Sequence, residues 1–147
     1  MKRKIIYFLP LLLLSITGCL KSSTDASNIV IPTGTFTGQF TRVHLHPATG
    51  KLDTLKANLT LTMSTTAGYA VSGDTTLHAA SHGGYAVDGV NIAFSDQTLP
   101  GSPTNTTPVP TKVHLNGVYS YGYNGSILQI AFASDTLSFF YNFTAKP

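Results

Sequence analysis

The chain has 147 residues, nine lysines and arginines, six aspartates and a formal net charge of +3. Lys2, Arg3 and Lys4 stand together at the N-terminus, and from Cys19 onward six bases balance six acids. Because no excess of positive charge remains there to follow a phosphate backbone, the charge pattern excludes nucleic acid as an expected partner.

Residues 1–18 have the three parts of a secretory signal peptide. The three bases precede an apolar run from Ile5 to Leu14, and small residues follow it. The run is shorter than the roughly 20 apolar residues of a transmembrane helix. We therefore expect residues 1–18 to be removed on export.

The motif that ends this segment is Ile16-Thr17-Gly18-Cys19. It resembles the lipobox of bacterial lipoproteins, in which an aliphatic residue and a small residue precede a cysteine. The resemblance implies that Cys19 is lipidated and that the protein is attached to a bacterial membrane, which we expect to be the outer membrane. Cys19 is the single cysteine, so no disulfide is expected. A plain signal peptide with an incidental cysteine is the alternative.

The segment after Cys19 is polar and has no periodicity as far as about residue 28. Such a composition predicts a flexible tether over residues 19–32, with a reach of roughly 20 Å. The remaining residues, 33–147, have the length of one domain.

Apolar and polar residues alternate through most of this domain, which is the pattern of half-buried strands. Asn124-Gly125 is the strongest hairpin signal. Many antiparallel strands joined by short turns predict an all-β fold, an antiparallel meander closing into a roughly eight-stranded barrel, with a β-sandwich as the alternative. Strands are expected near residues 34–46, 52–64, 69–73, 76–80, 84–88, 90–96, 112–123, 126–133 and 136–144.

The first predicted strand contains a change of phase. Phe36 and Phe40 share one face, whereas Val43 and Leu45 have the opposite parity. A β-bulge near Thr41-Arg42 would bring these apolar side chains to one face and bend the strand.

The same strand opens with Gly34-Thr35-Phe36-Thr37-Gly38. Followed by a meander that ends in an aromatic strand, it resembles the lipocalin-like or calycin-type small barrels found as lipoproteins in Gram-negative bacteria. Phe36 stands where lipocalins have the tryptophan of Gly-x-Trp. The resemblance implies a barrel and carries no ligand with it.

Two histidines, His44 and His46, lie two residues apart on a predicted strand and could present two imidazoles to one metal ion. A zinc site usually has three or four ligands, so His78 or His114 would have to approach them. We favour the simpler interpretation, in which His44, His46 and His114 face solvent between apolar neighbours. No metal and no other cofactor is expected.

The supply of catalytic groups is small. The chain has no glutamate and no Gly-x-Ser-x-Gly motif, and five of its aspartates stand at predicted turns. These absences predict that the protein is not an enzyme. Three Asp-Thr steps resemble an acceptor pattern for bacterial O-glycosylation, although a strand that begins after a turn explains them equally: Asp53-Thr54, Asp74-Thr75 and Asp135-Thr136.

The aromatic residues form two stripes. Tyr119, Tyr121 and Tyr123 alternate on one predicted strand, and Phe139 and Tyr141 alternate on the last. Such stripes form either part of a barrel core or the lining of a cavity for an apolar or amphipathic ligand.

Two functional hypotheses follow. The first is a lipid-anchored, non-enzymatic envelope protein that binds a small apolar or amphipathic ligand in its barrel through the aromatic stripes. The alternative is a structural or interaction lipoprotein of an envelope complex, which would use a sheet edge and the proline-rich connection 98–110 as its contacts. The expected partners are the membrane, through the N-terminal lipid, and either a small ligand or an envelope protein.

Overall fold

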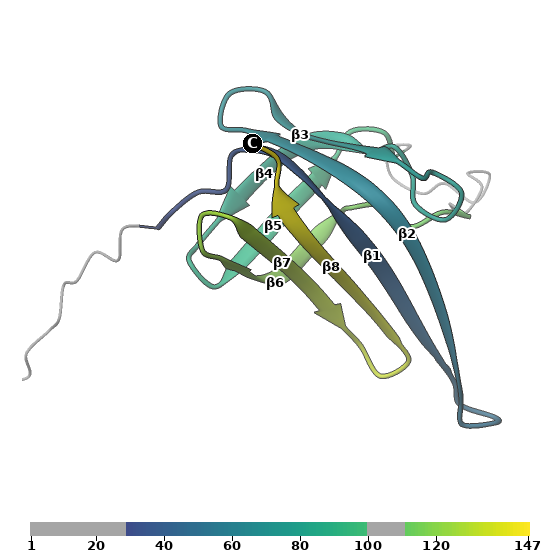
Figure 1. Cartoon of the computed structure of the whole chain (residues 1–147). Coiled ribbons are helices and arrows are strands. Elements are labelled where there is room, and N and C mark those ends of the chain that lie inside the picture. Colours follow the sequence, from purple (N-terminus) through teal and green to yellow (C-terminus); the bar gives the residue numbers. More distant parts are fainter. Residues whose placement is uncertain (1–28, 100–110) are drawn as a thin grey trace, which may run out of the picture.

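The computed structural model describes residues 29–99 and 111–147, which form eight strands (Figure 1). Each strand pairs antiparallel with the next, and β8 pairs with β1, so the sheet closes into a barrel. The predicted eight-stranded, lipocalin-like barrel is confirmed, and the alternative sandwich does not form. The strands are β1 (Gly34–His46), β2 (Lys51–Ser64), β3 (Gly68–Gly73), β4 (His82–Val87), β5 (Asn91–Asp96), β6 (Gly117–Tyr123), β7 (Ile127–Ala133) and β8 (Leu137–Ala145).

Several predicted features lie outside the described residues. They are the signal peptide over residues 1–18, Cys19 with the tether as far as residue 28, and residues 100–110 of the proline-rich connection. In the part of the chain that the structure describes, no helix is long and apolar enough to cross a membrane.

The register of β1 decides which side chains enter the barrel. Its pairing with β2 runs without interruption from Gly34 opposite Met63 to His46 opposite Lys51. Its pairing with β8 is also continuous, beginning with Phe36 opposite Ala145. Because successive side chains of a strand point to opposite faces, the even-numbered residues of β1 and the odd-numbered residues of β2 and β8 share the inner face.

The predicted bulge near Thr41-Arg42 is wrong, because both ladders of β1 continue through these residues. Phe36 and Phe40 are fully buried on the inner face, whereas Val43 and Leu45 are half-buried on the outer face. The apolar phase changes because β1 leaves the barrel core after Phe40. A regular strand therefore carries apolar residues first on one face and then on the other.

The hairpin between β1 and β2 projects beyond the closed part of the barrel (Figure 1). After Phe40 the remaining residues of β1 are half-buried or exposed, and burial on β2 begins only at Ala57. The β7–β8 hairpin accompanies this projection, since β8 stays paired with β1 as far as His44 opposite Leu137. Four strands thus continue as an open sheet past the core.

Residues 76–80 do not form the predicted strand. His78 makes an isolated parallel bridge to Val113, whose backbone amide donates a hydrogen bond to the Leu77 carbonyl (3.0 Å). The segment is fixed by this contact and by burial of His78, and it lies outside the ladder of the barrel.

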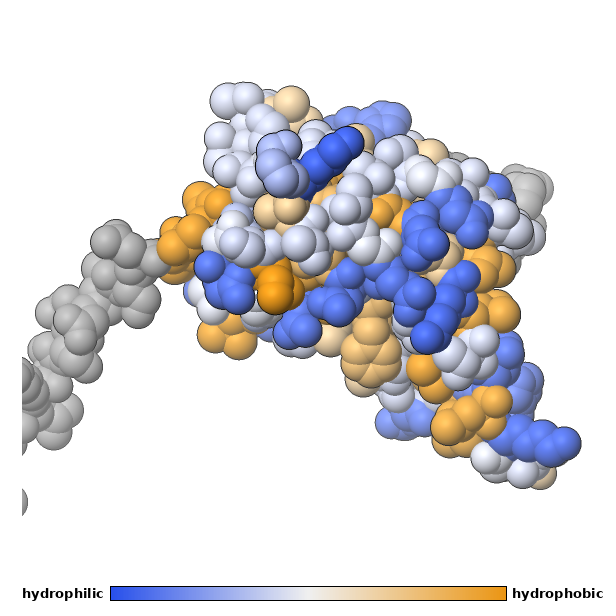
Figure 2. All heavy atoms as spheres, in the orientation of Figure 1, coloured by the Kyte–Doolittle hydropathy of each residue, from blue (hydrophilic) through white to orange (hydrophobic). Residues whose placement is uncertain are grey.

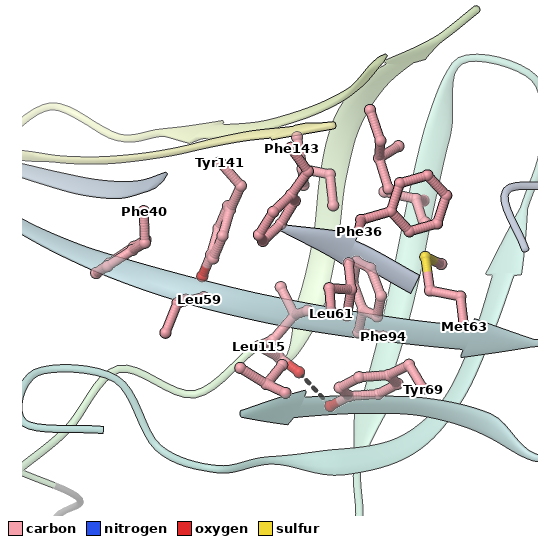
Figure 3. Packing of buried hydrophobic residues seen from close by; sticks show 14 of the residues in the cluster. Phe36, Phe40, Leu59, Leu61, Met63, Tyr69, Phe94, Leu115, Tyr141 and Phe143 are labelled. Carbon is pink, nitrogen blue, oxygen red and sulfur yellow. Dashed lines mark hydrogen bonds between the residues drawn. The ribbon is translucent and has the colours of Figure 1, made fainter. Parts of the chain in front are cut away.

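The predicted strand 112–123 is shorter in the structure. β6 begins at Gly117, opposite Phe94 of β5, and the residues before it run across the end of the barrel. Leu115 in this segment is fully buried, and its carbonyl accepts a hydrogen bond from the Tyr69 hydroxyl (Figure 3). Leu115 is therefore buried because its segment covers the end of the barrel, and not because it is an inward residue of a strand.

The hairpin predicted at Asn124-Gly125 is confirmed and joins β6 to β7. The side-chain oxygen of Asn124 accepts hydrogen bonds from the amides of Ser126 (3.0 Å) and Ile127 (2.7 Å). Gly125 has a φ of 92°, a conformation that glycine adopts at little steric cost.

Seven of the eight strands contribute buried side chains to one core cluster, part of which is drawn in Figure 3, and Tyr85 and Val87 of β4 pack against it. An eight-stranded barrel is narrow enough for side chains to fill. Phe36 is one of the fully buried members. The buried residues are Phe36, Phe40, Ala57, Leu59, Leu61, Met63, Tyr69, Val71, Ile92, Phe94, Leu115, Tyr119, Leu128, Ile130, Tyr141 and Phe143.

The two ends of the barrel differ in what they carry. At the N-terminal end lie residues 29–33, the turns β2–β3, β4–β5 and β6–β7, and the C-terminus. At the opposite end lie the projecting β1–β2 hairpin, the β7–β8 turn, the β3–β4 connection and the described parts of the β5–β6 connection. The chain therefore enters at the end remote from the projection (Figure 1).

Replacement of Gly38 by alanine tests the closure of the barrel. A Cβ atom at Gly38 would overlap the backbone of Asn142 and Phe143 on β8. We expect Gly38→Ala to lower the free energy of unfolding by about 1–3 kcal/mol in urea titrations, because the two strands must separate locally. Gly122→Ala is the control, since a Cβ there meets nothing within 4 Å. Equal stability of Gly38→Ala and the wild type would contradict this register.

Candidate functional site

The tyrosine stripe of β6 lies on the inner face of the barrel. Tyr119 is buried in the core, and Tyr121 and Tyr123 are partly buried against it. The ring centroid of Tyr119 is 5.9 Å from that of Phe94 and 6.2 Å from that of Tyr141. The stripe therefore packs against aromatic side chains from other strands.

The second stripe, on β8, behaves in the same way. Tyr141 is almost completely buried, with its ring 4.9 Å from that of Phe40 and 5.9 Å from that of Phe143. Phe139, closer to the opposite end, is half-buried and stacks at 5.8 Å on the partly exposed Phe132. Of the five residues predicted to bind a ligand, Tyr119 and Tyr141 belong to the hydrophobic core, and the other three are partly buried against it.

Burial also sets the ionisation of these tyrosines. Desolvation raises the pKa of Tyr141 well above its ordinary value and raises that of Tyr119. Both hydroxyls thus stay protonated at neutral pH and act as hydrogen-bond donors. The Tyr119 hydroxyl donates to the Asn116 carbonyl (3.1 Å), which ties the core to the segment before β6.

His78 is a buried polar residue that the sequence pattern did not reveal. Its ring is inaccessible to solvent and lies 5.1 Å from the ring of Phe40. Nδ1 is 2.8 Å from the Ala79 carbonyl, and Nε2 is 3.0 Å from the Tyr141 hydroxyl. A carbonyl can only accept, so Nδ1 carries the proton and Nε2 accepts the hydrogen bond from Tyr141.

The environment keeps His78 neutral, because desolvation lowers its pKa below the ordinary value. Both ring nitrogens are occupied by protein groups, which leaves neither free to bind a metal ion or to transfer a proton to a substrate. The arrangement fastens the β3–β4 connection to the core and is structural.

The remaining predicted metal ligands do not come together. The rings of His44 and His46 lie 4.6 Å apart on the inner face of the projecting hairpin, where His44 is half-buried and His46 is exposed. His114 instead pairs with Asp96, with Nδ1 2.7 Å from Oδ2. Among residues 29–99 and 111–147, no three histidine, cysteine or acidic residues form a group that could hold a metal ion.

Asp74 and Asp88 stand at turns and bind the backbone, as their sequence context predicted, whereas Asp53, also predicted at a turn, lies within β2 and pairs with Arg42. A side-chain oxygen of Asp88 accepts hydrogen bonds from the amides of Val90 (2.9 Å) and Asn91 (2.6 Å), and Asp74 accepts one from Thr76 (3.0 Å). These bonds lower the pKa values of both carboxyls. The carboxylates of Asp74 and Asp88 therefore hold turns of the backbone.

Arg42 is a charged residue on the strand next to Phe139. It lies opposite Phe139 on the inner face, where the strands leave the core. Its Nη2 is 3.6 Å from Oδ2 of Asp53, and its buried Nε has no hydrogen-bond partner among the described residues. A cation beside an aromatic pair is the kind of surface that an amphipathic anion could contact.

A hollow of about 360 Å³ lies on the outside of the barrel where β2, β3 and β4 meet. Its walls combine small and polar residues of these strands with the β2–β3 turn, and the lining contains neither carboxylate nor lysine nor arginine. The lining residues are Thr62, Ser64, Thr66, Ala67, Gly68, Tyr69, Ala70, His82, Gly83, Gly84 and Gln97.

No protein-family model, curated protein or solved structure matches this chain.

The pH dependence of stability tests the His78 assignment. The folded state disfavours the charged ring, so stability is complete above the ordinary pKa of 6.5 and is lost as the pH falls toward the lowered pKa. We expect the free energy of unfolding to decrease from about pH 7.5 to about pH 5.5 in denaturant titrations. His78→Gln should flatten this decrease, whereas the exposed control His82→Gln should retain it. An unchanged slope in His78→Gln would refute a buried neutral ring.

Proposed function

We propose that the chain is a lipid-anchored, non-enzymatic protein of the bacterial cell envelope whose barrel presents a contact surface to another envelope protein. Of the two hypotheses from the sequence, the core favours this second one. A barrel that carries a ligand needs room inside it, and here inward side chains from all eight strands pack on one another.

The anchor is supported by the sequence around Cys19. A basic segment, a short apolar run and the lipobox-like Ile16-Thr17-Gly18-Cys19 stand in the order that lipoprotein processing requires. The balanced charge after residue 18 leaves lipid as the main source of membrane attraction. Attachment through Cys19 would also leave the projecting hairpin at the far end of the barrel.

The proposed contact surface is the outer face of the projecting sheet, which is apolar where the inner face is polar. Val43 and Leu45 of β1, Leu52 of β2 and Phe140 of β8 all lie on its outer face, and we call them the outer apolar patch. Leu52 is 67% exposed and Phe140 is 46% exposed. Orange residues lie among blue ones along this hairpin in Figure 2.

Register makes this patch continuous. Leu45 and Leu52 are directly opposite each other, and Val43 is opposite Ser138, two residues from Phe140. Side chains in such direct and diagonal positions lie about 5–8 Å apart, so the four form one surface. The inner face of the same hairpin carries charged and histidine side chains, which means that the sheet has not simply turned its core side to solvent.

Loss of the thiol should release the protein from the membrane. We expect wild-type protein expressed in a Gram-negative host to incorporate labelled palmitate and to fractionate with membranes, and Cys19→Ala to do neither, because no acyl chain can then be attached. Ser22→Ala, which leaves the lipobox-like motif intact, is the matched control. Labelling of Cys19→Ala equal to the wild type would disprove lipidation at this residue.

Site-specific photo-crosslinking tests the outer apolar patch. A photoreactive amino acid at Leu52 or Phe140 should yield one discrete heavier species in cells, whereas the same group at Thr62, on the outer face of β2 near its other end, should not. Leu52→Ser should reduce the crosslink formed from Phe140, because the contact loses apolar area.

The contrary result is equally concrete. Equal crosslinking from all three positions would contradict a specific patch. A small apolar molecule that co-purifies in native mass spectrometry, and is lost in Arg42→Gln, would restore the ligand-binding hypothesis.

A further inference from the structure

The N-terminal end of the barrel carries a second set of exposed apolar side chains. They are Ile29, Val30 and Ile31 before β1, Val90 in the β4–β5 turn and Ile127 at the start of β7. Val90 is 68% exposed and Val30 is 62% exposed. Figure 2 shows orange residues gathered at this end, where the described chain begins. We call these five residues the apolar rim.

The leading segment is fixed to the barrel. Pro32 is buried, and its carbonyl accepts a hydrogen bond from the Tyr85 hydroxyl of β4 (2.8 Å). The side chain of Ile29 lies against Gly89, since a Cβ built at that glycine would be 3.5 Å from the Ile29 Cδ1 atom. Ile29 is thereby held next to the turn that contains Val90.

The other side of the rim is fixed as well. The carbonyl of Ser126, next to Ile127, accepts a hydrogen bond from the Ala145 amide (2.7 Å), and the Lys146 amide donates to the Thr35 carbonyl (2.7 Å). The β6–β7 turn, the end of β8 and the start of β1 are thus joined. Hydrogen bonds hold the backbone segments that carry the rim. The five side chains therefore stay exposed to water in the folded barrel.

We propose that the apolar rim rests on the lipid bilayer to which the chain is anchored. The proposal rests on the proposed lipidation of Cys19. Nine residues lie between Cys19 and Ile29, and even a fully extended chain spans at most roughly 36 Å over these ten peptide steps. The anchor therefore holds this end of the barrel close to the membrane surface, and the apolar rim is what the surface meets.

The charges at this end are compatible with such contact. The carboxylate of Asp88, in the same turn as Val90, is engaged by the Val90 and Asn91 amides and the Asn91 side chain. Lys146 adds a cation close to β1, which favours anionic head groups. Shallow burial of several isolated apolar side chains is typical of proteins that lie on a membrane interface.

Docking would orient the whole barrel. β1 has 13 residues and runs from the rim to the projecting hairpin, a length of roughly 40 Å for an extended strand. The outer apolar patch is then held away from the bilayer by the length of the barrel.

A single introduced tryptophan can report this docking, because the chain has none. Residues 19–147 of Val90→Trp are coupled through Cys19, the single thiol, to a maleimide phospholipid in phosphatidylcholine and phosphatidylglycerol vesicles. We expect its fluorescence to shift to shorter wavelength and to be quenched by phospholipids brominated on their acyl chains. Leu52→Trp, at the opposite end, is the matched control and should show severalfold less quenching.

A second variant removes the contact without touching the reporter. Adding Ile29→Ser and Ile31→Ser to Val90→Trp should abolish most of the quenching, with circular dichroism confirming that the barrel is retained. Quenching of Val90→Trp no greater than that of Leu52→Trp, with coupling complete, would overturn the proposal. Because the lipid is attached chemically, this outcome is distinct from a failure of Cys19 to be lipidated in cells.

Discussion

The pairing of the first strand with the last is the constraint on which the structure depends. β1 and β8 stay in register from Phe36 opposite Ala145 to His44 opposite Leu137, and this ladder converts a meander into a closed barrel. Closure gives every strand one inner face, and it requires a glycine at position 38 where the two backbones approach. The loop that it closes spans nearly the whole domain, so its entropy must be offset by the core it creates.

Alternation made the barrel predictable, because period two is visible wherever one face of a strand is buried. The same reasoning failed for Val43 and Leu45. It assumed that apolar residues of one strand share one face, and a bulge was needed to keep that assumption. The sequence pattern does not record where a strand leaves the core, and beyond Phe40 the outer face of β1 carries the apolar residues. The change of phase in β1 therefore marks the outer apolar patch and not a bulge.

The candidate site was less accessible to sequence reasoning. A tyrosine stripe has the same spacing whether it lines a cavity or fills a core, and only the rings that face it from other strands decide. His78 has no periodic neighbours, and its partner Tyr141 is 63 residues away. Likewise, nothing near His114 pointed to Asp96. Contacts at the ends of the barrel join residues that are far apart in the sequence. The alternation of apolar and polar residues cannot predict such contacts.

Neighbouring strands of the barrel differ in how many residues they pair. β3 and β4 share only two register pairs, Tyr69 opposite Gly83 and Ala70 opposite His82, and the hollow between β2 and β4 lies over this seam. Amide hydrogens here have the fewest ladder bonds to break before they can exchange with solvent. Transient parting at the seam would uncover a strand edge while the longer β1–β2 and β1–β8 ladders hold. The β3–β4 pairing is thus the weakest of the barrel, and a strand from another chain would pair with the sheet there first.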